Sequence, residues 1–209
     1  MTLSNYVRTL TILVFPACGL ASQDVRVPGA ADVSPGAVAA ARAPAEQDAR
    51  LITEAAMGPV RLRMTLDEAR RALPTASFTR TSDGDGAALV DVGFPDGESL
   101  VLWADEDDPE SPVDWSKKIV TIETFSATFH TRDGTRPGSL VRDVIRRFGP
   151  VQKIVESEIE SRQFITFARQ PEGVTFRLDY TGIFPPGTRR TTRFEPGAKI
   201  LSIAVSSSH

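Results

Sequence analysis

Two short helices are predicted by apolar residues that recur at helical spacing. Residues 65–73 begin with a Thr-x-x-Glu capping box and place apolar side chains at i, i+3 and i+7, before a Pro. Residues 139–148 begin with a Ser and place apolar side chains at i, i+4 and i+8, before a Gly-Pro pair. Each pattern gives one apolar face, so we expect Thr65 and Ser139 to cap two amphipathic helices.

Alternation of apolar and polar residues in the rest of the chain predicts antiparallel strands with one buried face. The first two strands cover 88–94 and 100–103 and are joined by a Pro-Asp-Gly-Glu turn. Five further runs are predicted to be strands: 119–131, 151–156, 163–168, 174–180 and 199–206. In the longest run, Phe125, Ala127 and Phe129 are expected on one side of a single strand.

The order of a helix followed by antiparallel strands occurs twice along the chain. We therefore predict an α+β fold of two tandem helix-plus-antiparallel-sheet repeats, at 51–104 and 119–206, joined by an acidic linker at 105–118. The net charge of -3 over 209 residues disfavours nucleic acid, for which a basic stripe would be expected. A nucleic acid is therefore not expected as a partner.

The N-terminus has the anatomy of an export signal. The chain's only long apolar run, Leu10–Ala17, ends at its only cysteine, Cys18. The run is shorter than the roughly 20 residues of a transmembrane helix, and Phe15–Cys18 resembles a bacterial lipobox. A lone cysteine forms no intramolecular disulfide, so residues 1–18 are predicted to be a lipoprotein signal peptide that ends at its lipid-attachment residue. Cleavage after Ala21 and an uncleaved apolar start are the alternatives.

Residues 19–50 have the composition of a spacer. They are rich in Ala, Pro and Gly and contain no aromatic residue. Such a segment buries too little apolar surface to offset its ordering entropy, so we predict a flexible tether. A short helix over 36–50 is the alternative, because Ala is dense there.

No catalytic or metal-binding motif is present. The chain has no G-x-S-x-G, H-E-x-x-H or P-loop pattern, and its two histidines, His130 and His209, have no partners spaced for zinc. The acidic run Asp105–Glu110 offers oxygen ligands for Ca²⁺, but such runs are usually solvated loops. We therefore predict no catalytic residue, no metal and no cofactor, and we do not expect an enzyme.

One long loop, 184–196, combines basic and aromatic residues. Arg and aromatic side chains are enriched at interface hot spots. The candidate partner-contact residues of this loop are Phe184, Arg189, Arg190, Arg193 and Phe194. The alternative is an exposed linker, because long loops in compact domains are often either functional or unstructured.

Two stretches resemble a family of small envelope lipoproteins. GPVRLRMTLDEARRALP, residues 58–74, is similar to the helix opening of the BamE/SmpA family of the outer-membrane β-barrel assembly machinery, and residues 131–149 look like a second copy. Arg63 stands where that family usually has Gly, whereas Gly138 keeps Gly at the equivalent position. The tandem layout also resembles the β-lactamase-inhibitor-protein fold. The resemblance implies a protein that acts by binding.

These observations predict a non-catalytic lipoprotein of the bacterial cell envelope that binds another envelope protein. A lipid anchor at Cys18 would hold it on a membrane facing the periplasm, and the outer membrane is preferred because Gly19 replaces the Asp of inner-membrane lipoproteins. A secreted enzyme inhibitor and an unfamiliar hydrolase are the alternatives. A binding protein predicts an exposed aromatic patch on the sheet, and a hydrolase predicts a deep pocket with convergent acids or bases.

Overall fold

The computed structural model describes residues 49–106, 108–158 and 161–207. The predicted signal peptide, its Cys18 and almost all of the predicted tether lie outside these residues. The division of the chain at 105–118 stays a prediction.

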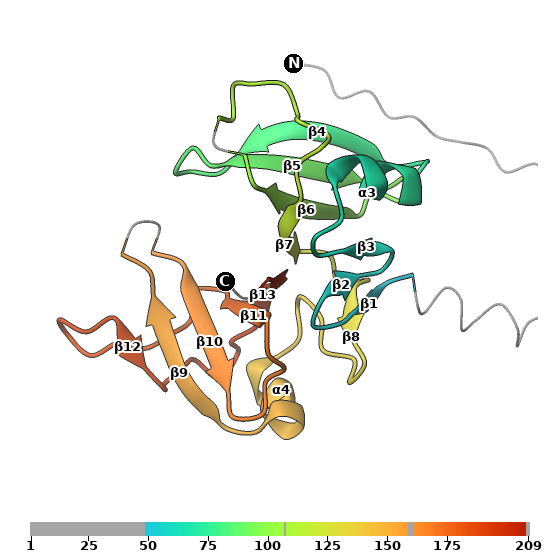
Figure 1. Cartoon of the computed structure of the whole chain (residues 1–209). Helices are drawn as coiled ribbons and strands as arrows, with labels where there is room; N and C mark the ends of the chain where they lie inside the picture. The colour runs from blue at the N-terminus through green and yellow to red at the C-terminus, as the bar shows by residue number, and fades with distance from the viewer. Residues whose placement is uncertain (1–48, 107, 159–160, 208–209) are drawn as a thin grey trace, which may run out of the picture. The chain divides into compact units, whose positions relative to one another are not determined.

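Thirteen strands and two helices follow one another in the described residues (Figure 1). The first half contains β1 (Leu51–Ile52), β2 (Ala56–Met57), β3 (Val60–Arg61), α3 (Leu66–Ala72), β4 (Ser77–Ser82), β5 (Ala88–Gly93) and β6 (Ser99–Ala104). The second half begins with β7 (Ile119–Thr124), β8 (His130–Thr131), α4 (Val141–Phe148) and β9 (Val151–Glu156). It continues with β10 (Gln163–Phe167), β11 (Val174–Leu178), β12 (Arg190–Thr191) and β13 (Ile200–Ser206).

The predicted fold of two tandem helix-plus-sheet repeats is wrong. The described chain is mostly β, and its two helices have only 7 and 8 residues. One nine-stranded antiparallel sheet, in the order β12-β9-β10-β11-β13-β7-β6-β5-β4, runs through both halves. The four-stranded sheet β3-β2-β1-β8 also joins them. The physical reason is that β7 pairs with β6 on one side and with β13 on the other. Hydrogen bonds on both sides of β7 therefore merge the two sheets that the sequence pattern suggested.

The two helices begin as their sequences predict, but only one has the predicted cap. The Thr65 hydroxyl accepts a hydrogen bond from the Glu68 amide at 3.1 Å, and the Glu68 carboxylate accepts one from the Thr65 amide at 2.8 Å. This capping box confirms the prediction for α3. The N-cap of α4 is Leu140, and Ser139 is instead an acceptor for the Arg136 amide. The expected Ser139 cap is therefore wrong.

The core lies on the side of the large sheet that the helices cover. Leu66 and Ala69 of α3, and Val144 and Phe148 of α4, are buried there. The Phe148 ring lies 5.6 Å from the ring of Phe176 on β11. Side chains alternate along each strand, so the residues between these core positions lie on the opposite face, which we call the open face. Its side chains include Asp91, Val101, Glu123, Phe164 and Arg177.

The residue two positions before each N-cap has a left-handed backbone. Arg63 has φ 68° and Gly138 has φ 85°. A left-handed residue other than Gly costs about 1–2 kcal/mol, whereas Gly adopts this conformation freely but loses about 0.5–1 kcal/mol through its entropy. We expect Arg63→Gly to raise the free energy of unfolding by about 0.5–1 kcal/mol.

Gly138→Ala is the matched reverse change. An added Cβ at Gly138 would meet no atom within 4 Å, so backbone strain alone should lower the stability, by about 1 kcal/mol. Urea unfolding of both variants checks the pair. Equal destabilisation by the two substitutions would contradict the assignment of strain to Arg63.

Candidate functional site

The predicted partner-contact loop is attached to the edge of the large sheet. Phe184 and Phe194 are half-buried and pack against the core, so they anchor the loop. Arg190 is exposed on β12, and Arg193 is exposed beyond it. The Arg189 guanidinium donates a hydrogen bond to the Ser157 carbonyl oxygen at 3.0 Å. The arginines are therefore more accessible than the phenylalanines, and the role of the loop in binding stays a prediction.

Exposed aromatic residues lie instead where two strands of the open face end. Phe125 follows β7 and is 45% exposed, and Tyr180 lies two residues after β11 and is 53% exposed. Both strands pair antiparallel with β13, which lies between them, so their carboxyl ends meet at the same edge. Ile183, three residues after Tyr180, is the other exposed large hydrophobic residue of the described chain. Sequence reasoning missed both residues because Phe125 lies within the alternating run 119–131 and Tyr180 ends the run 174–180, so each looked like an ordinary strand residue.

Arg177 joins the two aromatic residues into one group. Its guanidinium carbon lies 6.0 Å from the centroid of the Phe125 ring and 5.8 Å from that of Tyr180. It also donates a hydrogen bond to the Tyr180 hydroxyl at 2.7 Å. The Arg177 Nε atom is buried and has no hydrogen-bond partner among the described residues. We call Phe125, Arg177 and Tyr180 the aromatic–arginine cluster.

The backbone at Tyr180 is strained. Its φ angle is 64°, in the left-handed region that residues with a side chain rarely occupy. Such a conformation costs on the order of 1–3 kcal/mol and is retained where the surrounding structure or a function requires it. At Tyr180 the strain holds a large aromatic side chain in solvent beside Arg177, which points to a surface used for contact.

A shallow hollow of about 250 Å³ continues from the cluster across the open face. Its walls combine apolar side chains with charged groups. The lining residues are Thr81, Ser82, Asp83, Leu89, Asp91, Val101, Trp103, Glu123, Phe125, Arg162 and Arg177.

The charged groups of the hollow are held by neighbours. Arg162 and Asp83 form an ion pair at 3.7 Å, and the buried Glu123 carboxylate accepts a hydrogen bond from the Ser202 hydroxyl. Burial raises the pKa of Asp91 above its ordinary value. Asp91 and Glu123 are two strands apart in register, with Val101 between them. The Ser202 bond fixes Glu123 as a structural group in the sheet.

The acidic run near the linker is bound within the protein. Glu106 accepts two hydrogen bonds of 2.7 Å from the Arg80 guanidinium. Asp108 accepts one from the Ser111 hydroxyl, which lowers the pKa of that carboxyl. Within the described residues, no group of three or more His, Cys, Asp or Glu side chains could hold a metal ion. Glu106 is therefore held by Arg80 of β4, and the expectation that the run binds no metal stays a prediction.

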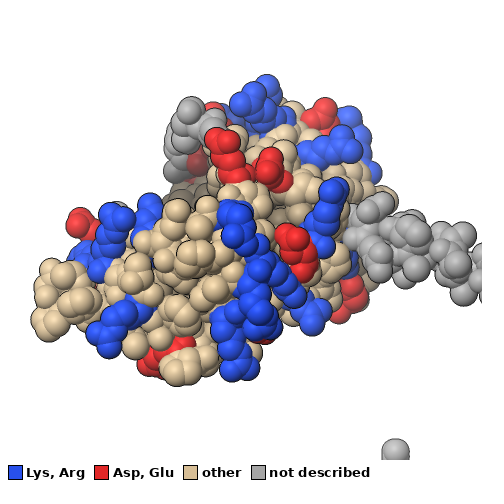
Figure 2. Space-filling model, turned by 90° about the horizontal axis from the view of Figure 1, so that it is seen from below, with Lys and Arg blue, Asp and Glu red and all other residues tan. Residues whose placement is uncertain are grey.

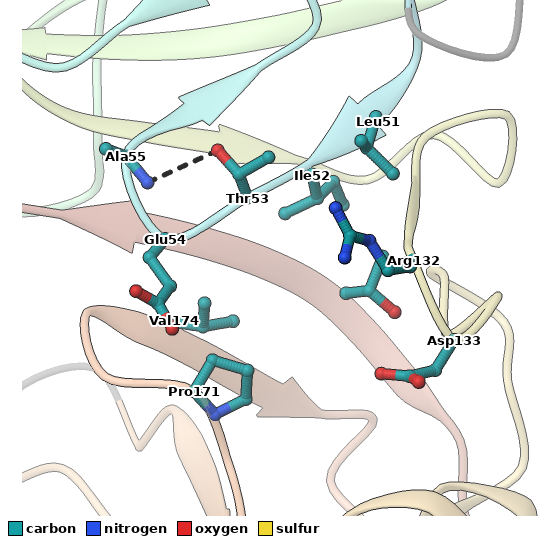
Figure 3. A pocket seen from close by; sticks show the side chains of 10 residues that line it. Leu51, Ile52, Thr53, Glu54, Ala55, Arg132, Asp133, Pro171 and Val174 are labelled. Atoms are coloured by element: carbon teal, nitrogen blue, oxygen red, sulfur yellow. Dashed lines mark hydrogen bonds between the residues drawn. The ribbon is translucent and has the colours of Figure 1, made fainter.

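A larger hollow, of about 430 Å³, lies beside β1 (Figure 3). Ile52, Pro171 and Val174 form apolar parts of its wall. Glu54 and Asp133 come from different turns and lie apart at its rim (Figure 3). Its two carboxylates, those of Glu54 and Asp133, therefore do not form a close pair (Figure 3).

Comparison with known proteins supports the fold alone. No protein-family model matches the chain, and no curated protein matches it. Among solved structures, the chain is similar to the uncharacterized protein yfeY from Escherichia coli, with 13% sequence identity and a TM-score of 0.50. The similarity covers 75% of this chain and 99% of that one. In the described residues, no helix is long and apolar enough to cross a membrane.

Proposed function

We propose that this protein is a non-catalytic binding module of the bacterial cell envelope, tethered by a lipid at Cys18. Its partner is another envelope protein, which binds the open face over the aromatic–arginine cluster. The observation that carries this proposal is the exposure of Phe125 and Tyr180 on either side of Arg177.

Three features of the cluster support a protein partner. Tyr, Arg and large aromatic residues provide most of the binding energy at protein interfaces. Arg177 lies about 6 Å from both ring centroids and donates a hydrogen bond to the Tyr180 hydroxyl, so less side-chain entropy remains to be lost when a partner binds. The strained backbone of Tyr180 also holds its ring in solvent, where a partner can reach it.

The cluster can be tested by photo-crosslinking in intact cells. A photoreactive phenylalanine analogue at position 125 or 180 should give one adduct with a discrete envelope protein. The same analogue at Arg71 is the control, because this side chain is 73% exposed but belongs to α3, on the covered side of the sheet. We expect Arg177→Gln to reduce the adduct formed at position 180, because truncated hot spots lose about 2 kcal/mol of binding energy, or roughly thirtyfold in affinity.

The proposal would be abandoned if the analogue at Arg71 captured the same protein as efficiently. It would also be abandoned if Arg177→Gln left the adduct unchanged. Circular dichroism of Arg177→Gln is required beside this measurement, so that a loss of fold is not mistaken for a loss of binding.

The tether can be tested by the intact mass of the membrane-extracted protein. We expect a chain that begins at Cys18 and carries a diacylglyceryl adduct, and we expect Cys18→Ser to lose both the adduct and membrane attachment. A soluble product that begins at Ser22 would replace the lipoprotein with a free secreted protein. The secreted-inhibitor alternative would then be favoured.

A further inference from the structure

Six exposed arginines gather on three segments around α4. They are Arg132, Arg136, Arg142, Arg146, Arg147 and Arg169, and we call them the arginine surface. Figure 2, seen from below, shows one large group of Lys and Arg side chains beside smaller separate ones, on the side on which α4 lies in Figure 1. The same segments carry three acids, Asp133, Asp143 and Glu172, so the surface has a net charge of about +3. The whole chain has a net charge of -3, so this surface is a local reversal of charge.

Hydrogen bonds bring the three segments together. The Arg147 guanidinium donates a hydrogen bond of 3.1 Å to the Thr135 hydroxyl, which joins α4 to the turn after β8. The Arg169 guanidinium donates one of 3.2 Å to the Arg147 carbonyl oxygen, which joins the end of α4 to the segment after β10. The side chains of Arg142 and Arg146 remain 66% and 71% exposed. The fold therefore places charges from distant parts of the sequence on one side of the protein.

The arginine surface differs from the aromatic–arginine cluster in its composition. The exposed large hydrophobic residues of the described chain are Phe125, Tyr180 and Ile183, and none belongs to the arginine surface. Protein interfaces are usually depleted of charge and enriched in aromatic residues at their centre. A surface with an excess of guanidinium groups and no exposed aromatic side chain fits a broad polyanion better than a second protein.

We infer that the arginine surface docks on the headgroups of an anionic phospholipid bilayer. A guanidinium group matches the two oxygens of a phosphodiester and remains charged at any physiological pH. Each Arg near an anionic bilayer strengthens binding by about fivefold. A bilayer can meet all three segments at once, and the surface has no exposed aromatic side chain on which nucleic-acid bases could stack. This inference is independent of the protein partner proposed for the open face.

Vesicle sedimentation of the full chain tests the inference. Cys18→Ser is used as the background, so that no acyl chain contributes to binding. Vesicles of phosphatidylcholine alone measure the binding that does not depend on lipid charge, including any binding through the apolar residues 10–17. We expect about a hundredfold stronger binding to vesicles with about 30% phosphatidylglycerol at about 0.1 M salt, and loss of this gain at about 0.5 M salt.

Two variants with the same change in charge separate the arginine surface from net charge. Arg142→Gln with Arg146→Gln removes two exposed arginines of the surface, and binding to the anionic vesicles should fall about 25-fold. Arg61→Gln with Arg71→Gln removes two exposed arginines outside it and should have an effect of about twofold or less.

Three outcomes would overturn the inference. The first is equal binding to anionic and zwitterionic vesicles. The second is an equal loss of binding in the two double variants, which would make the effect one of overall charge. The third is binding to a short DNA duplex at least as tight as binding to the anionic vesicles, with the same dependence on Arg142 and Arg146, which would make the surface a nucleic-acid site.

Discussion

Phe176→Ala is expected to lower the free energy of unfolding by about 3–5 kcal/mol. The Phe176 ring is fully buried and lies 5.6 Å from the rings of both Phe148 and Phe167. It also connects β11 to its neighbours, because Ile165 and Ile203 are its register partners. Truncation would leave a cavity at the place where α4 packs on the large sheet. Urea unfolding followed by circular dichroism measures the loss.

Phe164→Ala provides the matched control for Phe176→Ala. Phe164 lies on the adjacent strand and is the register partner of Arg177, but it belongs to the open face and is half-buried. Its truncation should cost less than about 1.5 kcal/mol, because less apolar surface returns to water. Equal losses for the two variants would show that the open face is covered in solution, and the assignment of faces would then be wrong.

Arg80→Met is expected to cost about 3–4 kcal/mol, because it leaves the Glu106 carboxylate buried without its cation. The side chains of Arg80 and Glu106 are only 16% and 6% exposed. The guanidinium also donates a hydrogen bond of 3.2 Å to the Ser111 carbonyl oxygen, so it connects β4 to the acidic linker. Glu106→Met in the same chain should restore at least half of the loss, because replacing both charges removes the desolvation cost.

Asp67→Asn is the control for exposed ion pairs. It breaks exposed ion pairs on α3 and should cost below about 0.5 kcal/mol.

The effect of Arg80→Met should depend on pH in a defined direction. The hydrogen bond from Arg80 lowers the pKa of Glu106 below its ordinary value. A lowered folded-state pKa gives a contribution that is fully present above the unfolded pKa, about 4.3, and is lost as the pH falls through the folded value. The difference in stability between the wild type and Arg80→Met should therefore be largest near neutral pH and shrink below about pH 4. A difference that grows on acidification would exclude this carboxylate as its source.

The sequence pattern predicted the helices and strands that depend on residues close together in the chain. The capping box at Thr65 and the apolar face behind it depend on residues three or four positions apart, and α3 forms there. The alternation at 88–94 and 100–103, with a turn between, likewise corresponds to β5 and β6. The two-residue strands β1–β3 and β12 have too few residues to show a period, so the sequence pattern missed them.

The predicted long strand at 119–131 shows how a local bond can override an apolar alternation. The Thr124 hydroxyl accepts a hydrogen bond from the Ser126 amide, and the Ser126 hydroxyl accepts one from the Thr128 amide. These bonds turn the chain after β7, as Ser and Thr side chains often do at turns. Phe125 and Phe129 therefore do not share one face of a strand, since Phe129 is buried and Phe125 is exposed.

The sequence by itself determined the start of α3, most strand segments and the candidate signal at Cys18, because these depend on residues close together in the chain. Only the tertiary structure decided that β7 and β13 pair, and this pairing turned two expected sheets into one. It also placed Phe125 near Arg177, 52 positions apart in the sequence, and gathered the arginine surface from three segments. Exposure and proximity depend on which strands become neighbours, and that choice rests on hydrogen bonds and burial between distant residues, which no local pattern records.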